Sequence, residues 1–177
     1  MTENLVIFSE DGNIIGSKTR QDVHMDPLRY WHGVTQIWVF NKDKQLLCTK
    51  RSSIVESNPD KWQTYVGGHV QNGDDFEGSA VKEINEEIGL VINRERLILI
   101  GESKYIPAKH ISKAYLVIFN SDTDNIVLND GEISEVRWMS LGEYDLLFEQ
   151  NPNNWCNTLN KKNQEKIMNL LKMERRW

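Results

Sequence analysis

The sequence predicts an α/β fold, in which strands and helices share a single domain over residues 1–177. The length of 177 residues and the hydrophobic content of 39% suit one domain with its own core. Short apolar runs bounded by turn residues alternate with stretches of helical spacing. The chain has no internal repeat, low-complexity tract or linker that would support a second domain.

Two hairpins are expected in the first third of the chain. Leu5–Ser9 and Ile14–Ile15 flank the turn Glu10–Asn13 and predict an N-terminal β-hairpin. Thr35–Asn41 first alternates and then becomes continuously apolar, and Gln45–Lys50 resumes the pattern, which predicts a second, central hairpin. The remaining expected strands are Trp62–Val66, Leu97–Tyr105, Ala114–Phe119 and Glu135–Met139, with a turn at Ser121–Asn125.

Helices are expected in the middle of the chain and towards its C-terminal end. Leu141–Phe148 reads as a helix that Asn151–Asn154 ends, and Lys161–Met173 reads as a closing helix. The most distinctive stretch is Gly67–Leu90, GGHVQNGDDFEGSAVKEINEEIGL. Within it a helix is predicted over Asp75–Ile88.

The ends of this helix carry recognisable signals. Asp74 stands at the expected N-cap and Glu77 follows three residues later, the spacing of a capping box. Gly89 can take the left-handed conformation that ends a helix. Ala80, Ile84 and Ile88 share one face, which we expect to meet the core.

Three glutamates gather on a neighbouring face of the same helix. At about 100° per residue, Glu83, Glu86 and Glu87 fall within an arc of about 100°. Like charges at this spacing repel by roughly 0.2–0.5 kcal/mol per pair. Such a stripe is therefore either a solvated acidic face or the holder of a cation. The small Ser79, one turn upstream, leaves room beside the carboxylates.

The frame around the glutamates resembles the signature box of the Nudix hydrolases. The pattern is glycine, five residues, an acid, seven residues, a base, and then Glu-apolar-x-Glu-Glu-x-Gly-apolar. Its positions in this chain are Gly68, Asp74, Lys82, Glu83, Ile84, Glu86, Glu87, Gly89 and Leu90. The resemblance implies an α/β/α sandwich with the box helix on one face of a mixed sheet.

Two box positions depart from the family pattern. Asp74 stands where the family usually has Glu, and Lys82 where it usually has Arg. In the family this pair supports the loop against the helix. Asp is one methylene shorter and Lys lacks the planar fork of Arg, so the link is expected to be looser.

The resemblance also implies the chemistry. Glu83, Glu86 and Glu87 would be catalytic and, with the Gly68 carbonyl, would bind Mg²⁺ or Mn²⁺, because hard oxygen ligands select these ions. The implied activity is pyrophosphatase-like hydrolysis of a diphosphate linkage in a nucleoside diphosphate or nucleotide-linked small molecule. The proton acceptor stays open between a box glutamate and a later acid: Glu102, Glu132 or Glu135.

The basic end of the second hairpin is the expected substrate contact. In the family a basic residue at this point commonly meets phosphate, which indicates Arg51 and, beside it, Lys50. The alternative is a solvated strand end. Trp31, Tyr65 and Tyr105 can stack on a base, although the core is an equally ordinary place for aromatic side chains.

One rival enzyme shares this fold. Asp11, Gly12, Gly16, Arg20 and His24 resemble the N-terminal segment of isopentenyl-diphosphate isomerases and a related Nudix subgroup. His24, His32 and His69 stand near the metal histidines of the isomerases, although an isolated histidine is more often a structural residue. Against an isomerase, Gly67 stands where its catalytic cysteine should fall, and Lys109–Ser112 replaces its later glutamates. A non-catalytic nucleotide-binding module is the other alternative.

Composition limits the partners. The net charge is −5 and no basic run stands out, so we expect a small phosphate substrate and no nucleic acid. No apolar stretch reaches the roughly 18 residues of a membrane helix, and no signal peptide is visible. Cys48 and Cys156 lack Cys-x-x-Cys spacing, which favours packing roles in a reducing cytoplasm. The resemblance adds a homodimer as an expectation.

Overall fold

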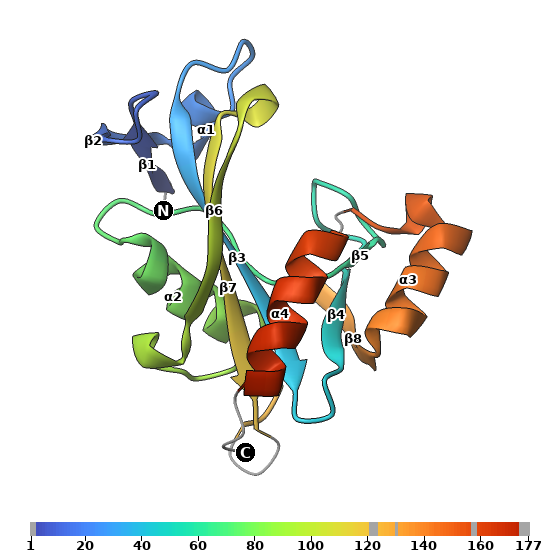
Figure 1. Cartoon of the computed structure of the whole chain (residues 1–177). Coiled ribbons are helices and arrows are strands. Elements are labelled where there is room, and N and C mark those ends of the chain that lie inside the picture. The colour runs from blue at the N-terminus through green and yellow to red at the C-terminus, as the bar shows by residue number, and fades with distance from the viewer. Residues whose placement is uncertain (1–2, 121–123, 130, 157–158, 174–177) are drawn as a thin grey trace.

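The structure is a computed structural model that describes residues 3–120, 124–129, 131–156 and 159–173 (Figure 1). These residues form eight strands and four α-helices. The expected α/β fold with a mixed sheet is confirmed. The expected turn at Ser121–Asn125 falls mostly outside the described residues.

Two long strands form the middle of the sheet. β3 (Trp31–Asn41) and β7 (His110–Phe119) pair in parallel, from His32 opposite His110 to Asn41 opposite Phe119. β6 (Ile98–Tyr105) adds to the far side of β7 in antiparallel orientation. Parallel and antiparallel pairs thus share one sheet.

The other edge of β3 is divided between two groups of strands. The hairpin of β1 (Asn4–Phe8) and β2 (Ile14–Thr19) meets the start of β3. β4 (Leu46–Arg51) meets its end and carries β5 (Trp62–Gln63) and β8 (Ile133–Met139). Between the two groups, residues 66–70 pair with β3 through the bridges Ile37–Val66 and Val34–His69. The glycine bend therefore lies where the edge of the sheet divides.

The central strands are buried on both faces, as their apolar runs predict. On β3, Ile37 and Val39 face the layer of α2 (Phe76–Ile88), with which Ala80, Ile84 and Ile88 form one core. Trp38 and Phe40 face the opposite core, which α3 (Leu141–Gln150) and α4 (Lys161–Met173) cover. Figure 1 shows the two layers, α2 on one side of β3 and β7 and α4 on the other. This is the α/β/α arrangement that the resemblance implies.

Several boundaries differ from expectation. The expected strand Trp62–Val66 is reduced to β5, with Val66 in an isolated bridge. β7 begins four residues earlier than expected, because its pairing with β3 continues to His32. The four-residue helix α1 (Arg20–Val23) follows β2 and was not predicted. The short 3₁₀ turns are Arg94–Arg96, Ile106–Ala108 and Pro152–Asn154.

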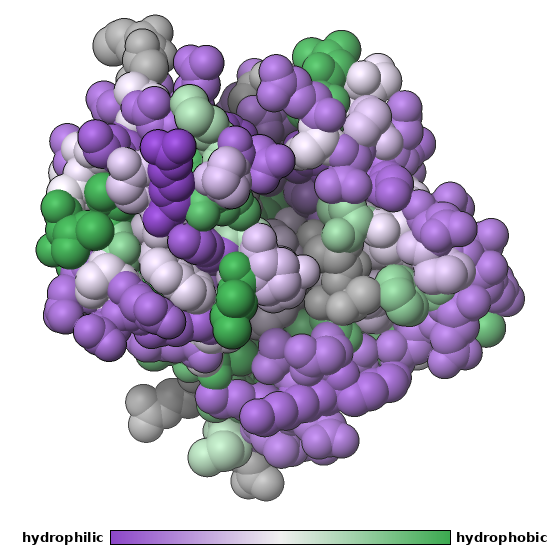
Figure 2. Space-filling model, turned by 90° about the horizontal axis from the view of Figure 1, so that it is seen from above, coloured by the Kyte–Doolittle hydropathy of each residue, from purple (hydrophilic) through white to green (hydrophobic). Residues whose placement is uncertain are grey.

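The surface is polar over most of the face that Figure 2 shows, and apolar residues stand there in small separate groups. No described helix is both long and apolar enough to cross a lipid bilayer.

Candidate active site

The box helix begins one residue later than the capping box predicts. The N-cap of α2 is Asp75, whose carboxylate accepts a hydrogen bond of 2.7 Å from the Gly78 N–H. Asp75 also pairs with Arg94 at 2.6 Å, and this bond holds the pKa of its carboxyl below the usual value. The prediction of Asp74 as N-cap is wrong, because only its neighbour reaches both the helix terminus and Arg94.

The other end of α2 is as predicted. Gly89 has φ +66° and its N–H bonds to the Asn85 carbonyl at 2.9 Å, so the left-handed residue ends the helix. A Cβ at this position would lie 2.8 Å from the Val127 carbonyl oxygen, which leaves no space for a side chain.

The expected support between loop and helix takes another form. Lys82 donates from Nζ to Oε1 of Gln71 at 2.5 Å, and the ion pairs of the described residues include none between Lys82 and Asp74. Glu77, expected in the capping box, instead accepts a 2.8 Å hydrogen bond from the Tyr115 hydroxyl. The loop and the helix are therefore joined by Gln71 and Lys82, and the helix is joined to β7 by Glu77.

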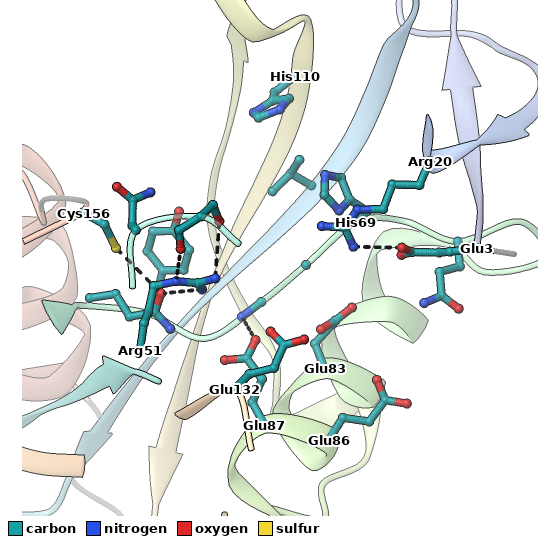
Figure 3. Close-up of a pocket in the computed structure, with 18 residues that line it drawn as sticks. Glu3, Arg20, Arg51, His69, Glu83, Glu86, Glu87, His110, Glu132 and Cys156 are labelled. Atoms are coloured by element: carbon teal, nitrogen blue, oxygen red, sulfur yellow. Dashed lines mark hydrogen bonds and ion pairs between the residues drawn. The ribbon is translucent and has the colours of Figure 1, made fainter. Parts of the chain in front are cut away.

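The three box glutamates differ in environment. Glu87 is buried, with 7% of its surface exposed, and its Oε1 accepts a 2.8 Å hydrogen bond from the Gly67 N–H. Glu83 is half-buried beside Gly68, and Glu86 is exposed. Figure 3 shows Glu83 and Glu86 extending from successive turns of α2, with Glu87 directed at the glycine bend.

The two glycines of the bend lie very close to β3 and to the Glu83 carboxylate. Gly67 has φ +147°, and a Cβ there would lie 2.2 Å from the Thr35 carbonyl oxygen. A Cβ on Gly68 would lie 2.4 Å from Oε1 of Glu83. Gly67 therefore requires glycine because of the backbone of β3, whereas a side chain at Gly68 would displace the Glu83 carboxylate.

The carbonyls of the two glycines have different partners. The Gly68 carbonyl accepts bonds from the Thr35 N–H at 2.8 Å and the Thr35 hydroxyl at 3.3 Å. It is thus directed at β3. The Gly67 carbonyl accepts no hydrogen bond from the residues that the structure describes. This makes Gly67 the better placed carbonyl for a cation, although the sequence indicates Gly68.

The pKa of the Glu83 carboxyl is strongly shifted by its surroundings. Burial, followed by the nearby negative charge of Glu86, raises its pKa from 4.5 to about 7. Glu3 and Glu132 add smaller effects in the same direction. A positive charge placed among these carboxylates would favour the ionised form of Glu83 and lower its pKa.

These residues line one cavity of about 820 Å³. The glutamates and the glycine bend form one part, and Arg51 lies across from them (Figure 3). Arg51 is held by Ser57, whose carbonyl accepts from Nε at 2.9 Å, and by Oε1 of Gln63 at 3.5 Å from Nη1. The guanidinium is thus fixed at the wall of the cavity. Its strand neighbour Lys50 does not line the cavity, so the structure places only one of the two predicted substrate contacts there.

Of the three later acids that the sequence offers as proton acceptors, only one lines the cavity. Glu132 lines the cavity next to Glu87 (Figure 3). Glu102 lies away from it and pairs with Lys113 at 3.2 Å. Glu135 is exposed on β8 and is not a lining residue.

Sequence reasoning missed part of the cavity wall. Glu3 and Arg20 form an ion pair of 2.8 Å at the end opposite Arg51. Arg20 appears in the N-terminal pattern, but no local signal indicates that Glu3 would face the box glutamates. Of the expected aromatic residues, Tyr65 lines the cavity, whereas Trp31 and Tyr105 do not.

The histidines gather at the same end of the cavity. His69 and His110 line it, and His32 is completely buried beside them. Burial lowers the pKa of His32 to about 4 and that of His69 to about 3, and the neighbouring imidazoles act in the same direction. At neutral pH these rings are uncharged and keep a lone pair.

The site fits the divalent metal that the resemblance implies. The available donors are carboxylate and carbonyl oxygens, the ligands of hard cations. The absence of a Cβ at Gly68 lets the Glu83 carboxylate lie against the bend. Glu83, Glu86, Glu87 and the Gly67 carbonyl are the residues that would hold such an ion.

The chain belongs to the Nudix family. The family's NUDIX domain model matches residues 30–157. A Nudix hydrolase of Clostridium acetobutylicum, described as uncharacterized, is 30% identical over 122 residues, which cover 66% of this chain and 58% of that protein. The chain is thus a Nudix-type enzyme, as the box predicts, and spans less than two thirds of this relative.

Other similar proteins extend over nearly the whole chain. An isopentenyl-diphosphate Δ-isomerase of Aliivibrio fischeri is 25% identical over 175 residues, covering 92% of this chain and 95% of the isomerase. The structure of DR0079 from Deinococcus radiodurans superposes with a TM-score of 0.69 at 19% identity, covering 98% and 100% of the two chains. The structure of a bifunctional NMN adenylyltransferase/ADP-ribose pyrophosphatase from Francisella tularensis, solved with AMP and a Mn ion, superposes with a TM-score of 0.55 at 18% identity. The match covers 84% of this chain and 43% of the Francisella chain.

Proposed function

We propose that this chain hydrolyses a diphosphate linkage in a nucleoside diphosphate or nucleotide-linked small molecule, with Mg²⁺ or Mn²⁺ as cofactor. The observation that carries the proposal is the shared cavity. Glu83, Glu86 and Glu87 line it with the glycine bend, and Arg51 stands across from them. A cation-binding group and a phosphate-binding group thus face one space.

Each group has a separate task. A divalent ion bound by the box glutamates would offset phosphate charge and make a bound water more acidic. Arg51 holds a phosphate of the substrate, since its planar guanidinium can bind two phosphate oxygens at once. Glu87 fixes the Gly67 N–H and with it the direction of the bend.

Hydrolysis also requires a proton acceptor. The attacking water gives up a proton as its oxygen bonds to phosphorus and the second phosphate leaves. Glu132 is the acid from a later segment that lies beside the box glutamates at the cavity. We assign it as the general base, with a box glutamate as the alternative.

The remaining expectations accompany this proposal. A cavity of about 820 Å³ is large enough for a nucleotide-sized molecule and supports a small phosphate partner rather than nucleic acid. Neither Cys48 nor Cys156 takes part in a disulfide, which supports a cytoplasmic location. A homodimer remains part of the proposal.

The test is turnover in paired variants. Nucleoside di- and triphosphates, nucleotide sugars, dinucleotides and ADP-ribose are assayed for phosphate release with Mg²⁺ and with Mn²⁺. Glu86→Gln and Glu87→Gln should each abolish metal-dependent cleavage while the chain stays folded. Glu165→Gln, an exposed change on α4, is the matched control and should keep full activity. Full turnover in both box variants would contradict the proposal, and nucleotide binding without turnover in the wild type would indicate a binding module.

Isopentenyl-diphosphate isomerisation is the second candidate, because isomerases align over most of the chain. The structure argues against it at one position. Gly67 stands where the isomerase cysteine is expected, and a Cβ there would lie 2.2 Å from the Thr35 carbonyl oxygen. Incubation with isopentenyl diphosphate separates the two candidates, since an isomerised product indicates an isomerase and released monophosphate indicates a hydrolase.

A further inference from the structure

A second, smaller cavity lies on the face of the sheet that α4 covers. Its volume is about 360 Å³. Its lining includes Gln36 and Trp38 of β3, Ala114 of β7 and Asn163 in the first turn of α4. In Figure 1, α4 crosses only the lower part of this face and its first turn is uppermost. The small cavity therefore lies where the cover of α4 ends.

The small cavity adjoins the large cavity that holds the box glutamates. Tyr65 lines both of them. On β3, Val34 lines the large cavity, whereas Gln36 and Trp38 line the small one. Alternate side chains of a strand share a face, and at about 3.3 Å per residue Val34 and Trp38 stand about 13 Å apart. A single nucleotide is long enough to place its phosphate in one cavity and its base in the other.

Trp38 brings an unused hydrogen-bond donor to the small cavity. The residue is 3% exposed, and its Nε1 has no hydrogen-bond partner among the described residues. Buried polar groups are nearly always satisfied. An indole N–H can only donate, so its partner must be an acceptor such as a carbonyl oxygen or a ring nitrogen. A hydrocarbon ligand such as an isoprenyl chain could not supply that acceptor.

Two amide side chains add further hydrogen-bonding groups. Gln36 on β3 and Asn163 on α4 both line the small cavity and are half-buried. Each amide carries donors and an acceptor. Together with the Trp38 N–H, they suit a ligand whose edge carries both donors and acceptors, as the edge of a nucleobase does.

The small cavity also has an aromatic surface with space beside it. The ring of Tyr65 lies edge-on to that of Trp38, with centroids 6.5 Å apart and planes at 89°. On β6, a Cβ at Gly101 would meet nothing within 4 Å, so space is open on that side. Aromatic side chains beside open space are a common setting for a flat heterocycle.

The charges of the two cavities differ. Among the described residues that line the small cavity, the charged ones are Glu102 and Lys162, and Glu102 pairs with Lys113 at 3.2 Å. One acid and one base leave this lining without net charge. The large cavity contains Arg51, a guanidinium that suits phosphate. The phosphates of a ligand are therefore expected in the large cavity and a neutral group in the small one.

The wall that α4 provides is held in place. The buried Gln164, next to Asn163, donates from Nε2 to Oδ1 of Asp145 on α3 at 2.9 Å. Lys166 donates from Nζ to the Ile100 carbonyl, which joins the helix to β6. A wall that is already fixed lowers the entropy cost of binding a ligand.

We propose that the small cavity binds the base of a nucleoside diphosphate whose phosphates lie in the large cavity. This inference rests on the proposed function and names its substrate class. The Trp38 N–H donates to an acceptor on the base, and the amides of Gln36 and Asn163 bind the rest of its polar edge. Tyr65 stands at the junction of the two cavities, between base and phosphates.

The test uses ligands without a diphosphate bond, so it measures binding independently of turnover. The full chain is titrated in a calorimeter, with Mg²⁺ present, with AMP, GMP, CMP and UMP. Ribose 5-phosphate, which lacks only the base, is the reference ligand. At least one nucleotide should bind at least about tenfold more tightly than ribose 5-phosphate. Equal affinity for all five ligands would overturn the proposal.

Two variants and a matched control assign the preference to the small cavity. Trp38→Phe removes the donor and keeps an aromatic ring, and Asn163→Ala removes an amide from α4. Each should reduce the advantage of the nucleotide over ribose 5-phosphate by at least about fivefold, with the affinity for ribose 5-phosphate unchanged. Asn169→Ala, an exposed change on the same helix outside the cavity lining, should keep the full advantage. An undiminished advantage in either folded variant, or an equal loss in the control, would overturn the assignment.

The two proposals can fail separately. Base-selective binding without cleavage of any nucleoside diphosphate would support the small cavity as a base site and contradict the proposed hydrolysis. Metal-dependent cleavage of nucleoside diphosphates without base-selective binding would do the reverse.

Discussion

Replacing Glu83 with Gln should make the metal-free protein more stable at neutral pH, although Glu83 belongs to the candidate active site. Burial and the charge of Glu86 raise the pKa of the Glu83 carboxyl from 4.5 to about 7. Above pH 7 the folded chain must then hold an ionised carboxylate that the unfolded chain ionises much more easily. The ionised Glu83 carboxylate therefore destabilises the metal-free folded state.

The size and sign of the effect follow from the two pKa values. Between pH 4.5 and pH 7 the folded state binds more protons than the unfolded state, so stability falls as pH rises. At roughly 1.4 kcal/mol per pKa unit the loss reaches about 3 kcal/mol by pH 8 and is only about 1 kcal/mol at pH 5. Glu83→Gln does not ionise, so it avoids the loss.

Urea denaturation with a chelator present, at pH 5 and at pH 8, measures the difference. Glu83→Gln should exceed the wild type by about 3 kcal/mol at pH 8, or roughly 6–12 °C in melting temperature. Added Mg²⁺ should narrow this gap, because the ion stabilises only the ionised wild-type site. Glu165→Gln is the control and should show no pH-dependent difference. A gap that is equal at both pH values, or a wild type that is the more stable at pH 8, would refute the reasoning.

Three further changes test other parts of the account. Gly67→Ala should lower the free energy of unfolding by about 1–3 kcal/mol in urea denaturation, because φ at this position is +147° and the new Cβ would meet the Thr35 carbonyl. An unchanged urea midpoint would show that the bend tolerates a side chain. Arg51→Lys should raise KM about tenfold in steady-state assays with little change in melting temperature, and an unaltered KM would remove Arg51 from the phosphate site. Asp75→Ala should lower the free energy of unfolding by about 1 kcal/mol through loss of the N-cap, whereas Asp74→Ala should lower it by less than about 0.5 kcal/mol. Thermal melts that rank the two variants in the opposite order would indicate Asp74 as the cap.

The local features of the site were predictable from sequence. The helix, its glycine end and the arc of glutamates depend on spacing within about one or two turns, and the structure reproduces them. The N-cap was predicted one residue early because Asp74 and Asp75 are equivalent as local signals. The choice between them depends on Arg94, which meets Asp75 from the next segment of the chain.

Strand geometry explains why Arg51, and not Lys50, lines the cavity. Lys50 and Arg51 are adjacent, and successive side chains of a strand point to opposite faces. Only one of the pair can reach the cavity, and the irregular pairing of β4 with β8 between these residues adds to the change of direction. The sequence indicates a basic strand end but not which residue faces the substrate.

The long-range members of the site could not be predicted. Glu3 reaches the cavity from the N-terminal end of the chain and carries no motif, and Glu132 is one of three acids among which the sequence could not choose. His110 meets His32 because β3 and β7 pair in parallel in one register, with these two residues opposite each other. Such a meeting depends on topology, which the spacing of residues along the chain does not contain.

The most direct test of the central claim follows an oxygen atom. The enzyme is incubated in ¹⁸O-labelled water with Mg²⁺ and a nucleoside diphosphate or nucleotide-linked substrate, and the products are analysed by mass spectrometry. If this cavity directs water onto phosphorus, one ¹⁸O atom appears in one of the two phosphate products for each bond broken. Products that carry no label, or a substrate that is bound or rearranged without cleavage, would contradict the account.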